Sequence, residues 1–212
     1  MVPTNQTNQT NQRALDVAAA VGLALGAVFG LAGTLVETAP VRQAFWAIDG
    51  VGLVVASALL TVRFLRRGSD CVAAGFLVFG IAESLVYSGT AAGLRASVPS
   101  FGAGVALWAA ALVLTSIPRE FAAWVRVVGV LAAMLFAVVA ARIFWGEQLL
   151  PTSAPLPFFA YPFLVATFVG WIWALVSDGA SSRPGVGPEQ PGRAPPRSAP
   201  PTGAAPPGAG VR

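Results

Sequence analysis

Six apolar runs dominate this sequence, and each is long enough to cross a lipid bilayer as a helix. A helix of roughly twenty apolar residues spans the hydrocarbon core, where the backbone must satisfy its own hydrogen bonds. With 56% hydrophobic and 10% charged residues, the chain is far more apolar than a soluble domain. The runs cover residues 14–36, 44–65, 71–91, 101–117, 121–144 and 158–177. The sequence therefore predicts an all-α, polytopic protein with six transmembrane helices and the lipid bilayer as its main partner.

Segments of different composition flank the six runs. The stretch before them, residues 1–13, repeats Thr-Asn-Gln three times and has little apolar surface to bury. The stretch after them, residues 178–212, is rich in proline, glycine and arginine and contains no aromatic residue. Such compositions do not form a packed core. We therefore expect a transmembrane domain at residues 14–177 between a disordered N-terminal segment and a disordered C-terminal tail.

The arginines predict the orientation of the chain in its membrane. All thirteen basic residues are arginines, and most of them fall at alternate ends of the apolar runs, around residues 13, 63–67, 119–126 and 183–197. The opposite ends hold only Arg42, Arg95 and Arg142. The positive-inside rule then places both termini in the cytoplasm. Arginine without lysine, together with abundant alanine, glycine and proline, is typical of a GC-rich bacterial genome, so we expect a bacterial inner membrane. The arginines form no single cluster, so no nucleic-acid partner is expected.

An internal repeat suggests how the helices are arranged. Residues 28–36 (VFGLAGTLV) resemble residues 78–86 (VFGIAESLV), fifty positions later, and residues 50–53 resemble residues 102–105. Self-similarity at a fixed period indicates a repeated structural unit. Here the unit is a helical hairpin, and the last pair of runs keeps the layout loosely. The sequence predicts three parallel helical-hairpin repeats.

Four glycines form a helix-packing stripe in the first run. Gly22, Gly26 and Gly30 follow one another at intervals of four, and Gly33 lies beside them. Small residues at this spacing let two membrane helices approach closely. The stripe is predicted to pack either against another helix of the same bundle or against a second copy of the chain, which would give a homo-oligomer.

Several kinds of chemistry are excluded by composition. Without histidine or lysine, the chain has no imidazole ligand for a metal or haem, no imidazole base and no Schiff-base amine. The single cysteine, Cys71, forms no internal disulfide. We therefore expect no cofactor and no metal site, and we assign no catalytic residue.

The most informative polar residue is Glu83, which lies in the middle of the third apolar run. An intramembrane acid costs several kcal/mol unless it is paired, hydrated or protonated, so it indicates a functional site. Other polar groups are predicted to lie near it on the external side of the bundle. The candidate polar site comprises Glu83, Asp49, Arg142, Tyr87, Ser84 and Tyr161.

Three functions remain open for such a site. The leading hypothesis is a non-enzymatic envelope or complex-supporting protein, in which Glu83 bonds to Ser or Tyr neighbours or pairs with Arg142 and fixes the helix register. The alternative is a small proton-linked transporter or channel that uses Glu83 together with Asp49. The second alternative is a membrane enzyme that acts on a lipid or isoprenoid, with one carboxylic acid protonating the substrate.

Overall fold

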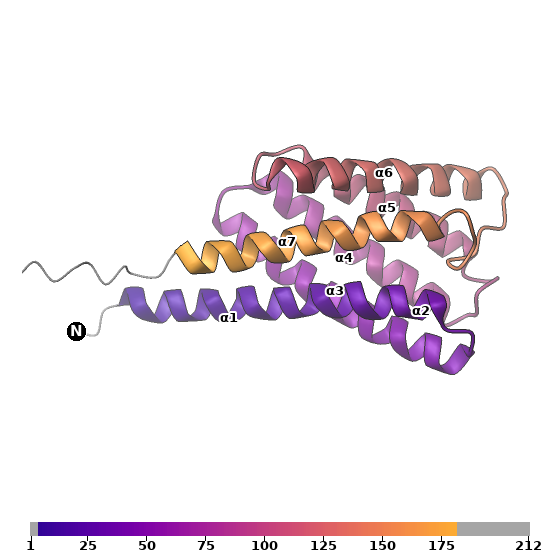
Figure 1. The fold of residues 1–212 in the computed structure, drawn as a ribbon, viewed down its shortest axis with the longest axis horizontal. Helices are drawn as coiled ribbons and strands as arrows, with labels where there is room; N and C mark the ends of the chain where they lie inside the picture. The colour runs from indigo at the N-terminus through magenta and orange to yellow at the C-terminus, as the bar shows by residue number, and fades with distance from the viewer. Residues whose placement is uncertain (1–3, 182–212) are drawn as a thin grey trace, which may run out of the picture. The chain divides into compact units, whose positions relative to one another are not determined.

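The computed structural model describes residues 4–181, and this part of the chain consists of helices and their connecting loops, without a strand (Figure 1). Six helices are long and apolar enough to span a membrane, which confirms the predicted fold class. The first is α1, Thr4–Leu25, which continues through a π-helical segment, η1, Gly26–Gly30, into α2, Leu31–Leu35. The others are α3, Ala39–Arg66; α4, Asp70–Thr90; α5, Val98–Ser116; α6, Ala123–Phe144; and α7, Tyr161–Ser181, preceded by a 3-10 turn, η2, Phe158–Ala160.

Both ends of the domain lie in helices. Helix α1 begins at Thr4, and the predicted disorder of residues 1–13 stays a prediction. At the other end, α7 continues to Ser181. The predicted disorder of residues 182–212 concerns a part of the chain outside the described residues.

Tight turns reverse the chain between the helices. Between α3 and α4, Gly68 has a φ of +74°, a value that side-chain-bearing residues rarely adopt. The amides of Arg67 and Ser69 both donate to the carbonyl of Phe64, at 3.1 and 2.9 Å, which satisfies the end of α3. Pro40 in the first turn of α3 lacks an N–H that would otherwise be unpaired there.

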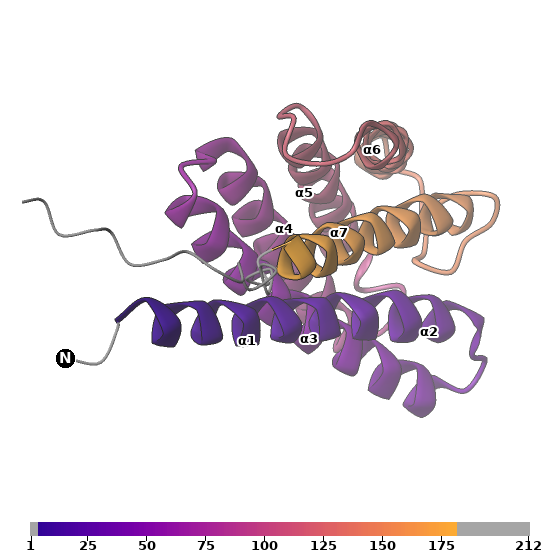
Figure 2. The ribbon, with the colours of Figure 1, turned by 60° about the vertical axis from the view of Figure 1, so that its left-hand side comes forward.

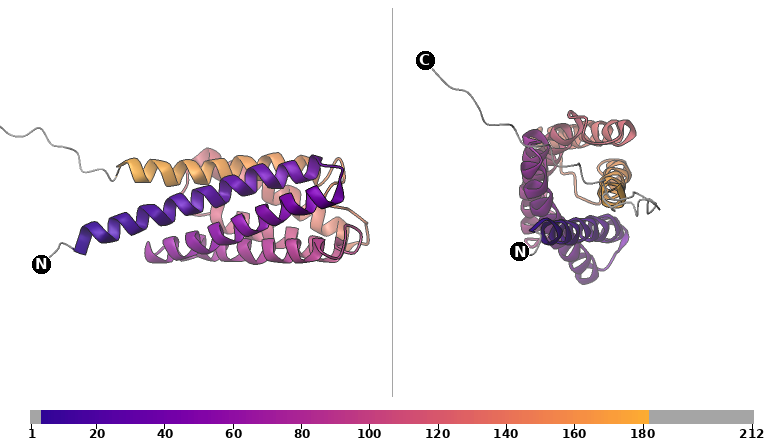
Figure 3. Two further views of the ribbon diagram at one scale, coloured as in Figure 1. Left: turned by 90° about the horizontal axis from the view of Figure 1, so that it is seen from below. Right: turned by 90° about the vertical axis from the view of Figure 1, so that its left-hand side faces the viewer.

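The helices follow one another around the bundle in chain order. Each spanning helix packs against the next one, and α7 also packs against α1. In Figure 2, α7 passes between α1 and α6. Seen along the bundle, the helices from α3 to α6 form a curved wall, and α7 lies on its inner side (Figure 3). The helices therefore form a closed ring, in which α7 completes the ring between α6 and α1 and packs over the interior. The predicted hairpin repeat stays a prediction. Of the two matching segments, residues 28–36 begin within the π-helical segment η1, whereas residues 78–86 lie within α4.

An aromatic cluster fills the middle of this interior. Trp171 of α7 lies at its centre, with its ring centroid 4.8 Å from that of Phe76, 6.0 Å from that of Phe79 and 5.6 Å from that of Phe168. Trp171 is only 2% exposed. Edge-to-face aromatic pairs, such as those of Trp171 with Phe76 and Phe79, add stability beyond the area that they bury. We call these residues, together with Phe64 and Phe121, the aromatic cluster.

The glycine stripe of the first helix lies against α3. A Cβ atom on Gly22 would come within 2.5 Å of the carbonyl oxygen of Gly52, and one on Gly30 within 2.9 Å of the Asp49 carboxylate. Gly26 faces Leu53 and Gly33 faces Trp46 in the same way. The stripe thus serves packing within the bundle. A homo-oligomer formed through it stays a prediction, and a second copy there would have to displace α3.

We expect Gly22→Ala to destabilise the bundle by about 1–3 kcal/mol, the usual cost of adding a methyl group where there is no room for it. The added carbon would press against the backbone of Gly52, which cannot rotate away as a side chain would. The measurement is the midpoint of unfolding in a titration of detergent-solubilised protein with dodecyl sulfate. Val21→Ile is the control, because it also adds one carbon but on the exposed face of the same helix. Equal midpoints for the two variants would contradict the close α1–α3 contact.

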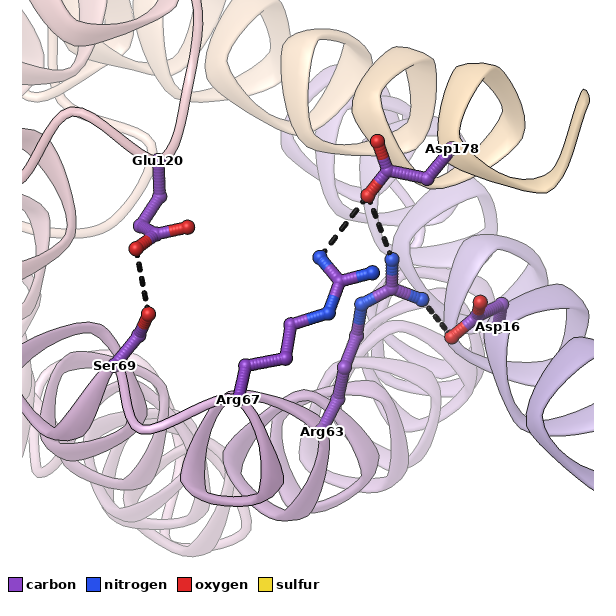
Figure 4. A network of polar contacts seen from close by, with 6 residues as sticks. All are labelled: Asp16, Arg63, Arg67, Ser69, Glu120 and Asp178. Atoms are coloured by element: carbon purple, nitrogen blue, oxygen red, sulfur yellow. Dashed lines mark hydrogen bonds and ion pairs between the residues drawn. The ribbon is translucent and has the colours of Figure 1, made fainter. Parts of the chain in front are cut away.

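A charged cluster closes one end of the bundle (Figure 4). Arg63 and Arg67 of the α3 end approach Oδ2 of Asp178 on α7 at 2.9 and 3.0 Å. Arg63 also forms an ion pair with Asp16 of α1. These four residues, which we call the ionic clamp, join α1, α3 and α7. Arg63 is only 5% exposed, so it is a structural group as well as part of the arginine pattern that predicts orientation.

Candidate functional site

A cavity lies inside the bundle, on the side of the aromatic cluster away from the ionic clamp. Its volume is about 60 Å³, which is enough for a few waters. Its walls come from the first helix and from α3, α4, α5 and α7. Most of the lining is apolar or aromatic, including Trp46, Phe101, Trp108 and Phe168.

Two carboxylic acids from neighbouring helices line this cavity. Asp49 lies on α3 and Glu83 on α4, and they are close enough to interact electrostatically. Glu83 is 3% exposed, and Asp49 is half-buried. Oδ1 of Asp49 and Oε2 of Glu83 are both buried and have no hydrogen-bond partner among the described residues. We call Asp49 and Glu83 the carboxyl pair.

The π-helical segment lies beside the Asp49 carboxylate. Gly26 is the first residue of this segment and Gly30 is the last, and both line the cavity. The Asp49 carboxylate occupies the space that a side chain at Gly30 would take. A π-helical turn inserts an extra residue into a helix, and such insertions are frequent at functional sites. The backbone of the first helix is thus adapted to hold an acid beside it.

Trp108 of α5 brings a single N–H group to the pair. Its side chain is 5% exposed, and its ring stacks near Phe79 with the centroids 6.1 Å apart. The indole lies close enough to Glu83 to interact with it, yet Nε1 makes no hydrogen bond of standard geometry in the described part of the chain. A buried N–H without a partner is uncommon in proteins. The cavity therefore contains one unpaired donor and two unpaired acceptors.

Tyr161 lies beside the pair but uses its hydroxyl elsewhere. Its side chain lines the cavity and interacts electrostatically with both acids. Its O–H donates to the carbonyl of Pro151 at 2.9 Å. Pro151 belongs to the loop between α6 and α7, is buried and lines the cavity. Tyr161 therefore attaches this loop to the cavity wall and leaves the carboxyl pair without its hydroxyl proton.

The structure brings four of the six predicted site residues together. Asp49, Glu83, Tyr87 and Tyr161 all line the cavity, with Tyr87 partly exposed at 43%. Ser84 is exposed and donates to the carbonyl of Gly80 within its own helix, at 2.9 Å. It lies outside the cavity because the residue after Glu83 is turned by about 100° around the helix.

Arg142 also lies apart from the carboxyl pair. Its Nη2 is 2.7 Å from Oε2 of Glu147, and its side chain is 42% exposed. The pairing of Glu83 with Arg142 that the sequence allowed is therefore not formed. Arg142 pairs with Glu147 instead because Glu147 follows the end of α6 and lies only five residues further along the chain.

Sequence reasoning missed Gly30 and Trp108 as parts of this site. Gly30 was assigned to a packing stripe, and Trp108 was not among the predicted site residues. One available signal was the internal repeat, which aligns Gly33 of the first helix with Glu83. This alignment indicates that small residues of the first helix lie near polar residues. Another was the depth of Trp108 in its apolar run, away from the membrane interfaces that indole groups favour.

The chemistry of the cavity favours a proton or a cation. No arginine lines it, and the described residues contain no group of three His, Cys, Asp or Glu side chains that could hold a metal ion. Two carboxylates in an apolar cavity repel one another unless a proton or another positive charge lies between them. No protein-family model, no curated protein and no solved structure matches this chain.

Proposed function

We propose that this protein is a small proton-linked transporter and that the carboxyl pair is its proton-binding site. The observation that carries the proposal is the unpartnered oxygen of Glu83, buried beside a second acid in a cavity. Intramembrane acids with this setting mark ion pathways and proton relays. A proton bound between Asp49 and Glu83 removes the repulsion of two negative charges and satisfies both acceptors.

A purely structural role for Glu83 has less support. That role requires a partner that fixes the helix register, such as a serine, a tyrosine or Arg142. The Ser84 hydroxyl donates to Gly80, the Tyr161 hydroxyl donates to Pro151, and Arg142 pairs with Glu147. These three predicted partners are thus engaged elsewhere, and Oε2 of Glu83 has no hydrogen-bond partner among the described residues.

We further propose that the protein lies in a bacterial inner membrane. The N-terminal end of α1 and the C-terminal end of α7 then lie on the cytoplasmic side. The support is the distribution of arginines between the two ends of the helices. In this orientation the ionic clamp is cytoplasmic, and the cavity lies in the outer half of the membrane. Arg42, Arg95 and Arg142 then face the periplasm.

Infrared difference spectroscopy of the protein in lipid bilayers tests the proton site directly. Between about pH 5 and 9, the range useful to a proton relay, we expect a protonated-carboxyl band that loses intensity as the pH rises. Glu83→Gln is expected to remove or shift this band. Glu37→Gln is the matched control, because Glu37 is an exposed acid in the α2–α3 turn.

Two results would contradict the proposal. One is a carboxyl signal that stays constant over the whole pH range, which indicates a permanent charge state and a structural role. The other is a titrating band that is the same in wild type and in the Glu83→Gln protein. Asp49→Asn provides a second test of the same pair, in case the Glu83 variant does not fold.

A further inference from the structure

The aromatic lining of the cavity carries information beyond the proton site. Trp46 and Trp108, from α3 and α5, face the same space as Tyr87 and Tyr161, from α4 and α7. A site for a proton alone needs no such walls, because a proton binds to the carboxyl oxygens. Aromatic faces attract positive charge through their ring quadrupoles, and this attraction is strongest when the cation has shed its water.

The unpaired polar groups of the cavity also select the charge of an occupant. Three of its hydroxyls are engaged, since Thr34 donates to Leu31 at 2.7 Å and Thr90 to Tyr87 at 2.7 Å, as Tyr161 does to Pro151. The buried acceptors without a partner among the described residues are Oδ1 of Asp49 and Oε2 of Glu83. An anion would meet the two negative charges of this pair, so the cavity disfavours it. A positively charged occupant would offset one of the two negative charges of the pair.

A bare metal ion fits this cavity poorly. Calcium and magnesium take six or more oxygen ligands, often including several waters or carbonyls. The cavity offers two carboxylates inside walls that are mostly apolar or aromatic. An organic cation needs fewer oxygen contacts, because its methyl or methylene groups pack against apolar walls while its charge faces the acids.

We propose that the cavity binds an organic ammonium ion in exchange for the proton of the carboxyl pair. The positive charge lies between Asp49 and Glu83, and the carbon substituents contact the aromatic walls. This inference rests on the proposed function, since it names the substrate class of the same site. One proton leaves as one cation binds, so the net charge of the cavity is the same in both states.

The groups that face Glu83 set the expected pH dependence. They are Asp49 on α3, Trp108 on α5 and Tyr161 on α7, with Tyr87 on α4 itself. No arginine lines the cavity, so no fixed positive charge competes with the ligand. Protons and the ammonium ion compete for the same two carboxylates. Binding should therefore weaken as the pH falls.

Calorimetric titration of the protein in lipid nanodiscs with tetramethylammonium tests this inference. This probe has no long apolar chain, so it does not partition into the bilayer on its own. We expect saturable binding that weakens by about tenfold or more from pH 8 to pH 5, as expected for a ligand that displaces a proton. Glu83→Gln and Asp49→Asn should each weaken it by about tenfold or more through loss of one charge. Glu37→Gln should leave it unchanged.

The outcomes separate this inference from the proposed function. A titrating carboxyl band without tetramethylammonium binding overturns the inference and leaves the proton site in place. Absence of both the band and the binding overturns the proposed function as well. Sodium that binds as tightly as tetramethylammonium would identify a site for inorganic cations and overturn the organic assignment. Binding that neither variant nor pH alters is adsorption to the surface and also counts against the inference.

Discussion

Trp171→Ala is expected to lower the free energy of unfolding by about 3 kcal/mol, the lower end of the range for removing a large aromatic side chain from a soluble core. Trp171 is 2% exposed and contacts Phe76, Phe79 and Phe168 in the aromatic cluster. The lower end applies because helices that separate within a bilayer exchange protein contacts for lipid contacts, without exposure to water. What is lost is close packing, which the neighbouring rings cannot restore by collapsing.

Trp173 supplies a matched control for this prediction. It lies two residues further along α7, on the outer side, and is 68% exposed. Trp173→Ala should change the midpoint of unfolding in dodecyl sulfate much less than Trp171→Ala does. The aromatic cluster would not be a stabilising core if the two substitutions had the same effect.

Arg63→Gln is expected to cost about 3 kcal/mol, because it removes one partner from a buried ion pair and leaves the other charge uncompensated. Arg63 is 5% exposed and joins Asp16 of α1 to Asp178 of α7. Arg67 still reaches Asp178 in the variant, whereas Asp16 loses its cation. The seam between the first and last helices should therefore loosen first, which hydrogen exchange in α1 and α7 can detect.

Arg66→Gln is the control for the ionic clamp, since Arg66 lies in the same turn of α3 and is exposed. Its effect should stay below about 1 kcal/mol, as for other surface charges. A double variant, Arg63→Gln with Asp16→Asn, removes both charges and should recover part of the stability. The comparison is between the stability loss of the double variant and the sum of the losses for Arg63→Gln and Asp16→Asn alone. If the two values are equal, Arg63 and Asp16 do not act as a pair.

The fold class could be predicted from the sequence because lipid imposes a simple rule. An apolar run of bilayer length must be helical, whatever its partners are. The boundaries of α4 and α6 came within about three residues of the prediction for the same reason, since charged residues end the apolar runs. The arrangement of helices around the bundle did not follow from this rule. It depends on which faces fit together, and most faces consist of the same few apolar residue types.

The candidate site could be predicted only where a residue was conspicuous in its own helix. Glu83 and Asp49 are acids within apolar runs, and both line the cavity. Ser84 was placed beside Glu83 because helical spacing alone did not show which side of the helix faces inward. Arg142 was placed near Glu83 by its depth, but its nearest acid in the chain, Glu147, is the one that it binds. Contacts between distant helices decide such questions.

The order of helices around the ring has a consequence for how the protein is made. The ribosome delivers helices in sequence, so the hairpin that carries Asp49 and Glu83 enters the membrane before α7 exists. Until α7 arrives, the walls that Tyr161 and Phe168 contribute are missing, and the seam with α1 is open. Until α7 is inserted, the two acids therefore face lipid or the insertion machinery. The cavity closes when α7 is added, and not when the acids enter the membrane.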